Sequence, residues 1–538
     1  MDQAESEEAR RDTVLLAMMA SAGSILSFLY FFFSDQILLY GDAVAHINIA
    51  RRVFDSRTPG PQQLGTVWLP LQHMLTIPFI TWDWAWRTGA GGSVVSMAAY
   101  VAAAMGIARL FWGGGVARSV LWTSRSLRWA GWIAALVYLA NPNLMYLQST
   151  AMNEPLAMAL AIWTIVFYGE FARGLRSHEL NAAGEKLQGC AIALAGGMLT
   201  RYDAWMLAAL IGAAVSWQLI STGGVPGALR RPVRNTIILV ALAPALWLAY
   251  NLGTYGNPLE FATGPYSARA IAQRSQSGGE SYPGEHNPRL AAIYYLKAAE
   301  LNAAPQRMPA LFVATVLLGS AAMLWGGNLW LLAMFWSPAF FYPLSMAYGS
   351  VPIFMPVWWP FSYYNTRYGI QLLPLFAVAL GFVLVNCLVM KSRTRAWLAG
   401  LLIVLPLAGY LYQWRETPVV LREARVNAET RVAFETQLAL ALEKLPQGTT
   451  LLIYTANHVG ALQRAGIHLR RAITENNYMI WQGALQRPAQ EADYVVAMEG
   501  DPVWLAAERD KALLEPVTRV AVKGQPAAVI YKSKTTLH

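Results

Sequence analysis

Charge is scarce in this sequence. Only 13% of its 538 residues are Asp, Glu, Lys or Arg, whereas soluble domains carry about 25%. The hydrophobic fraction is 56%, and the chain holds 21 tryptophans. This balance excludes an ordinary soluble enzyme. It indicates an integral membrane protein, because many of the apolar runs reach the roughly 20 residues needed to cross hydrocarbon.

Cysteine is also scarce. Cys190 and Cys387 are the only two, and both lie in apolar runs, so a structural disulfide is not expected and a cysteine cluster for a metal is excluded. The net charge of +10 does not indicate a nucleic-acid partner, because most Lys and Arg residues flank apolar runs. The sequence also lacks internal repeats and low-complexity tracts.

The apolar runs predict about eleven membrane spans. The first run follows MDQAESEEARRD, which is acidic and has neither a signal-peptide n-region nor a small-residue cleavage site, so we expect a retained first span. The predicted spans are 13–33, 89–110, 128–147, 155–172, 187–200, 203–220, 234–252, 308–325, 328–347, 368–390 and 396–413.

The basic residues of the short loops predict the orientation of these spans. They fall on one side, which we take as cytoplasmic together with the N-terminus. They are Arg109, Arg118, Arg125, Arg128, Arg173, Arg176, Lys186, Arg230, Arg231, Arg234, Lys391, Arg393 and Arg395. The outer side then receives a first outer loop (34–88) and a long outer loop (253–307). Segment 65–82 is apolar but broken by prolines, and is predicted to lie in the outer interface without spanning.

The composition changes after residue 413. A helical stretch (427–445) precedes β-type runs at 449–455, 492–498, 517–523 and 527–533. Strands interleaved with helical segments predict a small α/β domain. The predicted fold class is therefore a polytopic α-helical membrane domain (1–413) followed by an extracytoplasmic soluble α/β domain (414–538).

Ionisable groups collect at the predicted outer ends of the spans. They are Asp42 and His46 after the first span, Glu154 at the start of the fourth, Arg201 and Asp203 between the fifth and sixth, and Arg367 at the start of the tenth. Each alone could be a structural ion pair or a helix-end residue in headgroup water. Asp42 and His46 are four residues apart, so they share a helix face and could pair with each other. Carboxylates and arginines gathered at one level suggest a lipid-phosphate substrate.

Four stretches resemble a known family. They are GDAVAHINIARRVFD (41–55), WLPLQHML (68–75), LTRYDAW (199–205) and NTRYGIQLLPLF (365–376). Their order and layout resemble the GT-C superfamily of polyprenyl-phosphate-sugar-dependent glycosyltransferases, such as protein O-mannosyltransferases and aminoarabinose transferases. The resemblance covers about residues 13–413. Asp42 is followed by Ala43 and not by a second acid, and the WWD signature of oligosaccharyltransferases is absent, which favours a monosaccharide on a polyprenyl monophosphate.

The resemblance implies roles for these residues. Asp42 becomes the base that deprotonates an acceptor hydroxyl, with inversion at the anomeric carbon. Arg201 and Arg367 become contacts for the departing phosphate, with Arg52 and Lys297 as further candidates. Glu154 and Asp203 are counted with the catalytic residues: they could orient the acceptor, pair with the arginines or hold a divalent ion.

The remaining predicted substrate-binding residues are His46, His73, Tyr202 and Tyr368. His73 could instead be a polar tip at the membrane interface. The family includes metal-dependent and metal-free members, so Mg²⁺ or Mn²⁺ stays open and no metal ligand is assigned. The expected partners are a polyprenyl-phosphate-linked sugar, membrane lipids and an acceptor that is a protein, lipid or glycan.

Two rival functions remain. A polytopic lipid or sugar transporter would suit the many spans, although related halves are absent and many transporters are built from repeats. A non-catalytic surface scaffold would use the C-terminal domain alone.

The short loops favour a bacterial inner membrane as the location.

Overall fold

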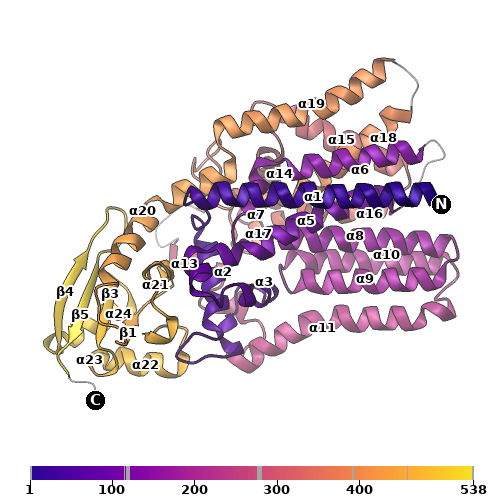
Figure 1. Cartoon of the computed structure of the whole chain (residues 1–538). Coiled ribbons are helices and arrows are strands. Elements are labelled where there is room, and N and C mark those ends of the chain that lie inside the picture. The colour runs from indigo at the N-terminus through magenta and orange to yellow at the C-terminus, as the bar shows by residue number, and fades with distance from the viewer. Residues whose placement is uncertain are drawn as a thin grey trace.

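The computed structural model describes residues 3–113, 115–116, 122–275, 281–389, 393–456 and 458–535. Arg118 and Lys391 of the predicted basic loops lie outside the described residues. Figure 1 shows long helices running side by side in one body, with a small sheet at one end and the N-terminus at the other.

Every predicted span coincides with a helix or with two consecutive helices. These are α1 (Gln3–Phe33), α5 (Ala90–Trp112), α6 (Ser124–Leu139), α8 (Glu154–Arg176), α9 (Leu180–Met198), α10 (Asp203–Ser221), α11 (Arg230–Tyr255), α15 (Pro309–Trp325), α16 (Leu329–Phe335) with α17 (Ser337–Tyr348), α18 (Leu373–Val389) and α19 (Arg393–Glu416). In the described part of the chain, eight helical segments are long and apolar enough to cross a membrane. The polytopic helical class is confirmed, and the number of spans stays a prediction.

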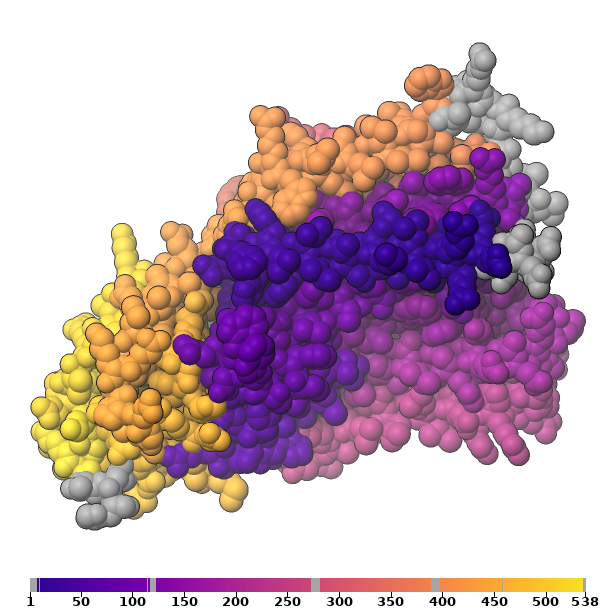
Figure 2. Space-filling model, viewed as in Figure 1, coloured from indigo at the N-terminus to yellow at the C-terminus, as the bar shows by residue number. Residues whose placement is uncertain are grey.

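The apolar helices present hydrophobic side chains on the outside of the molecule. Figure 2 shows α1 lying along the surface of the helical body. Leu26 and Phe33 of this helix are 67% and 77% exposed. Large apolar side chains this exposed are costly in water and are expected where a helix faces lipid.

Short helices fill the predicted outer loops. They are α2 (Gly41–Arg52), η1 (Pro61–Leu64), α3 (Leu71–Thr76), η2 (Ile77–Phe79), α4 (Asp83–Thr88), α12 (Glu260–Thr263), α13 (Ala268–Ser275) and α14 (Pro288–Ala303), while η3 (Gly227–Leu229) precedes α11. Two further short helices belong to predicted spans: α7 (Pro142–Gln148) continues span 128–147 after a break at Ala140 and Asn141, and η4 (Thr366–Leu372) leads into α18. The segment predicted to lie in the interface contains only α3 and η2. Six α-helical residues extend about 9 Å, far too short to cross hydrocarbon.

The C-terminal part is a five-stranded mixed sheet with helices. Its strands are β1 (Leu451–Ile453), β2 (Ala472–Ile473), β3 (Tyr494–Met498), β4 (Leu514–Val520) and β5 (Ala528–Ser533). Its helices are α20 (Val419–Leu442), α21 (Val459–Ala465), η5 (Leu469–Arg471), α22 (Tyr478–Gln486), α23 (Pro488–Glu491), α24 (Pro502–Arg509) and η6 (Lys511–Leu513). The strand order is β2-β1-β3-β5-β4. β1 pairs in parallel with β2 and β3, and β5 pairs antiparallel with β3 and β4.

This sheet confirms the predicted α/β class. The sequence missed β2, because two residues are too few to show an alternating pattern. The predicted helical stretch begins at residue 427, eight residues after the observed start of α20 at Val419. The domain boundary at 413 stays a prediction.

Helix α20 is packed into the membrane domain. The Val420 amide donates to Oδ1 of Asn143 on α7 at 3.0 Å, and the Tyr40 hydroxyl donates to the Val420 carbonyl at 2.9 Å. The first turn of α20 therefore lies against the start of α2 and carries its side chains to the end of the helical body.

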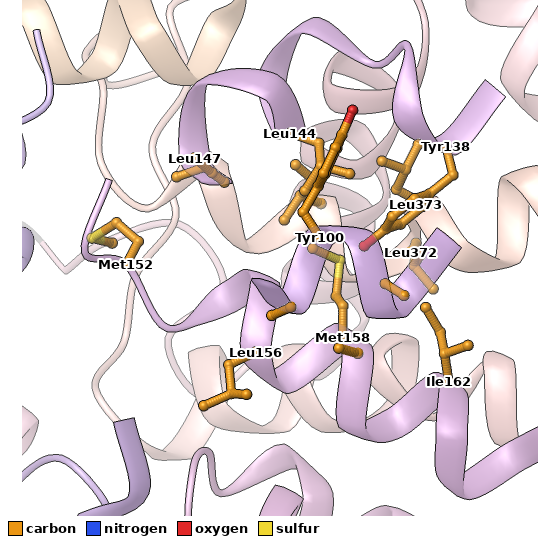
Figure 3. Close-up of a cluster of buried hydrophobic side chains, with 14 of the residues drawn as sticks. Tyr100, Tyr138, Leu144, Leu147, Met152, Leu156, Met158, Ile162, Leu372 and Leu373 are labelled. Carbon is orange, nitrogen blue, oxygen red and sulfur yellow. The ribbon is translucent and has the colours of Figure 1, made fainter. Parts of the chain in front are cut away.

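A buried apolar cluster supports this end of the body. Figure 3 shows Tyr100 of α5, Tyr138 of α6, Leu144 of α7, Met158 of α8 and Leu372 of η4 converging. The Tyr100 hydroxyl donates to the carbonyl of Leu139 at 2.6 Å. Close packing of this kind holds side chains in single rotamers, so it fixes the start of α8 relative to η4.

Candidate functional site

Three helix N-termini converge at the end of the helical body, and each carries an acid in its first turn. Asp42 lies in the first turn of α2, Glu154 begins α8 and Asp203 begins α10. Pro155 follows Glu154 and fits the first turn, where its missing N–H is not needed. The positive end of a helix dipole favours a negative charge at these positions.

Arg367 of η4 joins these helices. Its Nη2 lies 2.5 Å from Oδ2 of Asp42, its Nε 3.2 Å from Oε1 of Glu154, and its Nη1 3.2 Å from Oε1 of Glu423 on α20. All three guanidinium nitrogens are thus occupied by carboxylates from three separate elements. The planar, multiply donating guanidinium suits this arrangement, whereas a lysine ammonium does not.

Arg201 extends the network. Its Nη1 donates to Asn153 Oδ1 at 2.7 Å and to Glu154 Oε1 at 3.4 Å. Its Nη2 donates to the Tyr342 hydroxyl at 2.8 Å, and that hydroxyl donates to Oδ2 of Asp203 at 2.9 Å. Glu154 is therefore shared by both arginines, and the network runs unbroken from Asp42 to Asp203.

Exposure separates the four carboxylates of this network. The Asp42 side chain is 37% exposed, while Asp203 is 13% exposed and Glu154 and Glu423 are each 1% exposed. A carboxylate buried without a partner is costly, and Arg367 compensates both buried glutamates. Asp42 is consequently the carboxylate of the network that is best placed to meet a substrate.

Tyrosine rings hold the two guanidinium groups in place. Tyr368 lies 5.2 Å from the guanidinium of Arg201 and 5.1 Å from that of Arg367, and Tyr40 lies 5.0 Å from the guanidinium of Arg367. Cation–π contacts of this length favour a fixed position of the charge. The predicted substrate-binding residue Tyr368 thus lies between the two predicted phosphate contacts.

The two predicted histidines pair with each other. His46 Nδ1 lies 2.8 Å from His73 Nε2, and His73 Nδ1 is buried without a hydrogen-bond partner. Burial lowers the pKa of His46 to about 4 and that of His73 well below its ordinary value. The sequence left open a pairing of His46 with Asp42; in the structure Asp42 bonds Arg367 and His46 bonds His73 of α3.

The other predicted residues lie outside the network. Lys297 forms an ion pair with Glu300 at 2.5 Å. The Tyr202 hydroxyl accepts from Trp247 Nε1 at 3.1 Å, away from the arginines. Arg52, at the far end of α2, donates from Nε to the carbonyl of Gln63 at 2.5 Å.

Sequence reasoning missed three members of the network. Glu423 was assigned to the C-terminal domain. The one sequence feature that could have indicated it is an acid next to the apolar residues of VVLREA (419–424). Tyr342 lies inside a predicted span, where the adjoining Pro343 marks an irregular helix. Asn153 stood beside Glu154 without any pattern to single it out.

The described residues contain no group of three or more His, Cys, Asp or Glu side chains arranged to hold a metal ion. In the network, carboxylate oxygens bond arginines instead. No metal ligand is assigned from these contacts, and the metal dependence that the family resemblance left open stays open.

An apolar groove of about 670 Å³ opens between α3, η2, α5, α8 and α9, and none of the residues that line it belongs to the network. Leu75 and Phe79 form one end, and they follow His73 on α3 and η2. Along α8 the lining runs from Leu156, two residues after Glu154, to Phe167. Eleven helical residues span about 16 Å, so the groove extends well into the helical body, between α5, α8 and α9.

Comparison with solved structures shows a similar fold. The chain is similar to ArnT of Cupriavidus metallidurans, in a crystal structure bound to undecaprenyl phosphate, with a TM-score of 0.55 and 14% identity over 96% of this chain and 97% of that chain. It also matches the Archaeoglobus fulgidus oligosaccharyltransferase tethered with an acceptor peptide, with a TM-score of 0.47 and 13% identity over 97% of this chain and 74% of that chain. No protein-family model and no curated protein matches the chain.

Proposed function

We propose that this chain, which has the fold of the GT-C glycosyltransferase superfamily, transfers a sugar from a polyprenyl phosphate to an acceptor hydroxyl at the outer membrane face. The observation that carries the proposal is the position of Asp42. It is the most exposed carboxylate of a network that is otherwise largely buried, it is fixed at 2.5 Å by Arg367, and it lies just beyond the first span.

The reaction needs one base and one leaving group. The acceptor hydroxyl gives its proton to Asp42 as its oxygen attacks the anomeric carbon. The bond between that carbon and the phosphate oxygen then breaks, and polyprenyl phosphate leaves with the electron pair. Direct displacement inverts the anomeric configuration, and a positioned base of this kind contributes about 10²–10⁴-fold.

Glu154 and Glu423 act as positioning residues in this proposal. Both are 1% exposed and bond Arg367, so they fix the guanidinium that fixes Asp42. Arg201 and Arg367 are retained as proposed phosphate contacts. Because both already bond carboxylates, a phosphate that reaches them must replace one of those partners.

The apolar groove supports a polyprenyl donor. A tail lying between α5, α8 and α9 would place its polar head at the outer end of the groove, beside α3 and the first turn of α8. ArnT, which is similar over nearly its whole length, was solved with undecaprenyl phosphate. We place the site at the outer face of a bacterial inner membrane, with the C-terminal domain on the same side.

The direct experiment uses the purified chain in lipid nanodiscs with undecaprenyl-phosphate-linked sugars. Mass spectrometry follows the release of undecaprenyl phosphate and transfer of the sugar to water or to added protein, lipid and glycan acceptors. Release that depends on Asp42 supports the transferase. Movement of intact donor across a proteoliposome membrane, without cleavage of the sugar–phosphate bond, supports the transporter instead.

A further inference from the structure

A second cavity lies on the outer side of α2, between the first outer loop and the C-terminal domain. Its volume is about 260 Å³, close to the lower end of about 300 Å³ for small-molecule pockets. Its lining comes from α2, from residues 63–68, from Tyr266 and Ile271 of the long outer loop, and from C-terminal residues such as Thr455 and Glu475.

The cavity shares a helix face with the proposed base. Ala45, Ile49 and Arg52 line it from α2, and these positions follow Asp42 at intervals of three, four and three residues. Residues at such intervals lie along one side of a helix. A ligand held in the cavity is therefore aligned with the side of α2 that carries Asp42.

Arg52 and its neighbour Arg51 differ sharply in their partners. Arg51 bonds Asp55 at 2.8 Å and Asp83 at 2.6 Å. Arg52 uses Nε for the Gln63 carbonyl at 2.5 Å, and among the residues that the structure describes it forms no ion pair. Burial lowers the pKa of the Arg52 guanidinium. Glu475 attracts this cation electrostatically, but no carboxylate of the described residues bonds it directly, so its guanidinium can bond an anionic ligand.

A buried acceptor atom is also unsatisfied at this wall. Gln63 is 1% exposed. Its Nε2 donates to Thr58 and to the carbonyl of Asn476, while its Oε1 has no hydrogen-bond partner. The facing carboxyl, Glu475, accepts from the Thr455 amide at 2.9 Å and from its hydroxyl at 2.8 Å, and it interacts with Arg52 electrostatically without forming an ion pair with it.

The rest of the lining is suited to a sugar. Aromatic side chains and hydroxyl or amide groups both line the cavity: Trp68, Tyr266, Tyr478, Ser56, Thr474 and Asn476. Aromatic side chains combine an apolar face with a polar tip, and hydroxyl and amide groups can both donate and accept hydrogen bonds. A guanidinium adds a paired donor for a carboxylate or phosphate.

We propose that this cavity is the acceptor subsite and binds an anionic sugar group, with Arg52 contacting its carboxylate or phosphate. The assignment rests on the proposed transferase function and names the acceptor class that function would use: an acidic or phosphorylated glycan. The cavity lies between the outer loop and the C-terminal domain, so both parts select the acceptor.

Binding of simple anionic sugars tests the proposal without any donor. The full chain in nanodiscs is titrated with glucuronate, glucose 6-phosphate and glucose, and calorimetry measures the binding of each sugar. We expect at least one anionic sugar to bind ten-fold or more tightly than glucose. The sugar that binds more tightly, glucuronate or glucose 6-phosphate, shows whether the cavity prefers a carboxylate or a phosphate. Arg52→Gln should remove this preference. Arg57→Gln, on the same loop but exposed and outside the cavity, is the matched control and should keep it.

A second variant tests the cavity without changing charge. Ala456 lines the cavity and is exposed, so Ala456→Phe obstructs it with little risk to folding, and it should weaken anionic-sugar binding ten-fold or more. Equal affinity for glucose and both anionic sugars, or unchanged binding in Arg52→Gln, overturns the proposal. Competition by undecaprenyl phosphate also overturns it, because the cavity would then belong to the donor. If the anionic sugars bind as expected but the protein does not cleave the donor, the result contradicts the proposed transferase function and not the binding property of the cavity.

Discussion

The Asp42 carboxylate and the Arg367 guanidinium lie 2.5 Å apart although 325 residues separate them in the chain. The contact joins the first turn after the first span to the start of the tenth predicted span. It also fixes the one well-exposed acid of the network against a guanidinium whose other two nitrogens are held by buried glutamates. The proposed base is thus held by three elements at once.

Asp42→Asn should abolish transfer. The amide keeps the shape and one hydrogen bond to Arg367 but cannot take a proton, so we expect release of undecaprenyl phosphate to fall about 10²–10⁴-fold. Asp83→Asn is the matched control, because Asp83 also bonds an arginine, Arg51, at 2.6 Å and is exposed. Near-normal release in Asp42→Asn would remove it as the base, and an equal loss in both variants would indicate a structural effect.

Glu423→Ala should lower both stability and activity. The change strips a carboxylate from Arg367 and leaves the Thr366 amide, bonded at 2.7 Å, without an acceptor. An unsatisfied buried group costs about 1–3 kcal/mol, which a thermal-unfolding assay detects. Glu423→Gln should recover most of the stability, because its amide oxygen can accept from Thr366.

The exposed Glu429 lies on the same helix, and Glu429→Ala controls for loss of a charge from α20. Equal melting temperatures for Glu423→Ala and Glu429→Ala would show that the Arg367 contact adds nothing. If Glu423→Ala loses stability but keeps full turnover, Glu423 contributes to folding and does not position Asp42.

The sequence predicted the fold class well because its determinants are local. Apolar run length located every predicted span on one helix or on two consecutive helices, and the layout indicated a fold that proves similar to that of ArnT. Asp42, Glu154, Asp203, Arg201 and Arg367 could be named because charge is rare beside spans. The hydrogen-bond and ion-pair partners of these five residues could not be predicted, because tertiary packing decides which side chains meet.

Glu423 and Tyr342 illustrate that limit. Glu423 stands in a charged amphipathic segment, where an acid is ordinarily solvated, and only the packing of α20 against α7 and α2 buries it. Tyr342 stands in an apolar run, where a tyrosine is ordinarily packing. The pairing of His46 with His73 instead of Asp42 follows from the placement of α3, which sequence spacing does not encode.

Tyr342→Phe should reduce turnover with a small stability cost. The hydroxyl bridges Arg201 at 2.8 Å and Asp203 at 2.9 Å, and removal of one such bond costs about 1 kcal/mol. Without it, Arg201 and Asp203 are left 3.8 Å apart and lose their common support. Initial-rate measurements should show a lower kcat. Tyr348→Phe, on the same helix but exposed, should leave the rate unchanged.

The paired histidines should make the protein acid-sensitive. The folded pKa of His46, about 4, lies below its ordinary value of 6.5, and the pKa of His73 is lowered too. Unfolding therefore takes up protons, so the stability they contribute is present above about pH 6.5 and is lost as the pH falls toward 4, at about 1.4 kcal/mol per pH unit for each histidine.

The double variant His46→Asn with His73→Gln removes both titrating groups. Between pH 7 and pH 5 its melting temperature should fall less than that of the wild type. His458, whose pKa burial also lowers to about 4, is present in both proteins and cancels. His178→Asn, at an exposed position, should follow the wild-type curve; parallel curves for all three proteins would contradict the assignment.

Filling the apolar groove should affect long-chain donors only. Ala98 lines the groove from α5, and Ala98→Phe would occupy space proposed for the polyprenyl tail while leaving Asp42 and Arg367 untouched. We expect KM for an undecaprenyl-linked donor to rise about ten-fold, with kcat and the KM of a donor carrying a two-isoprene chain little changed, because a short tail does not reach down α8. Ala241→Phe on α11 is exposed but outside the groove and should change neither constant. An equal effect on both donors would place the tail elsewhere and indicate that the bulky ring disturbs α8 itself.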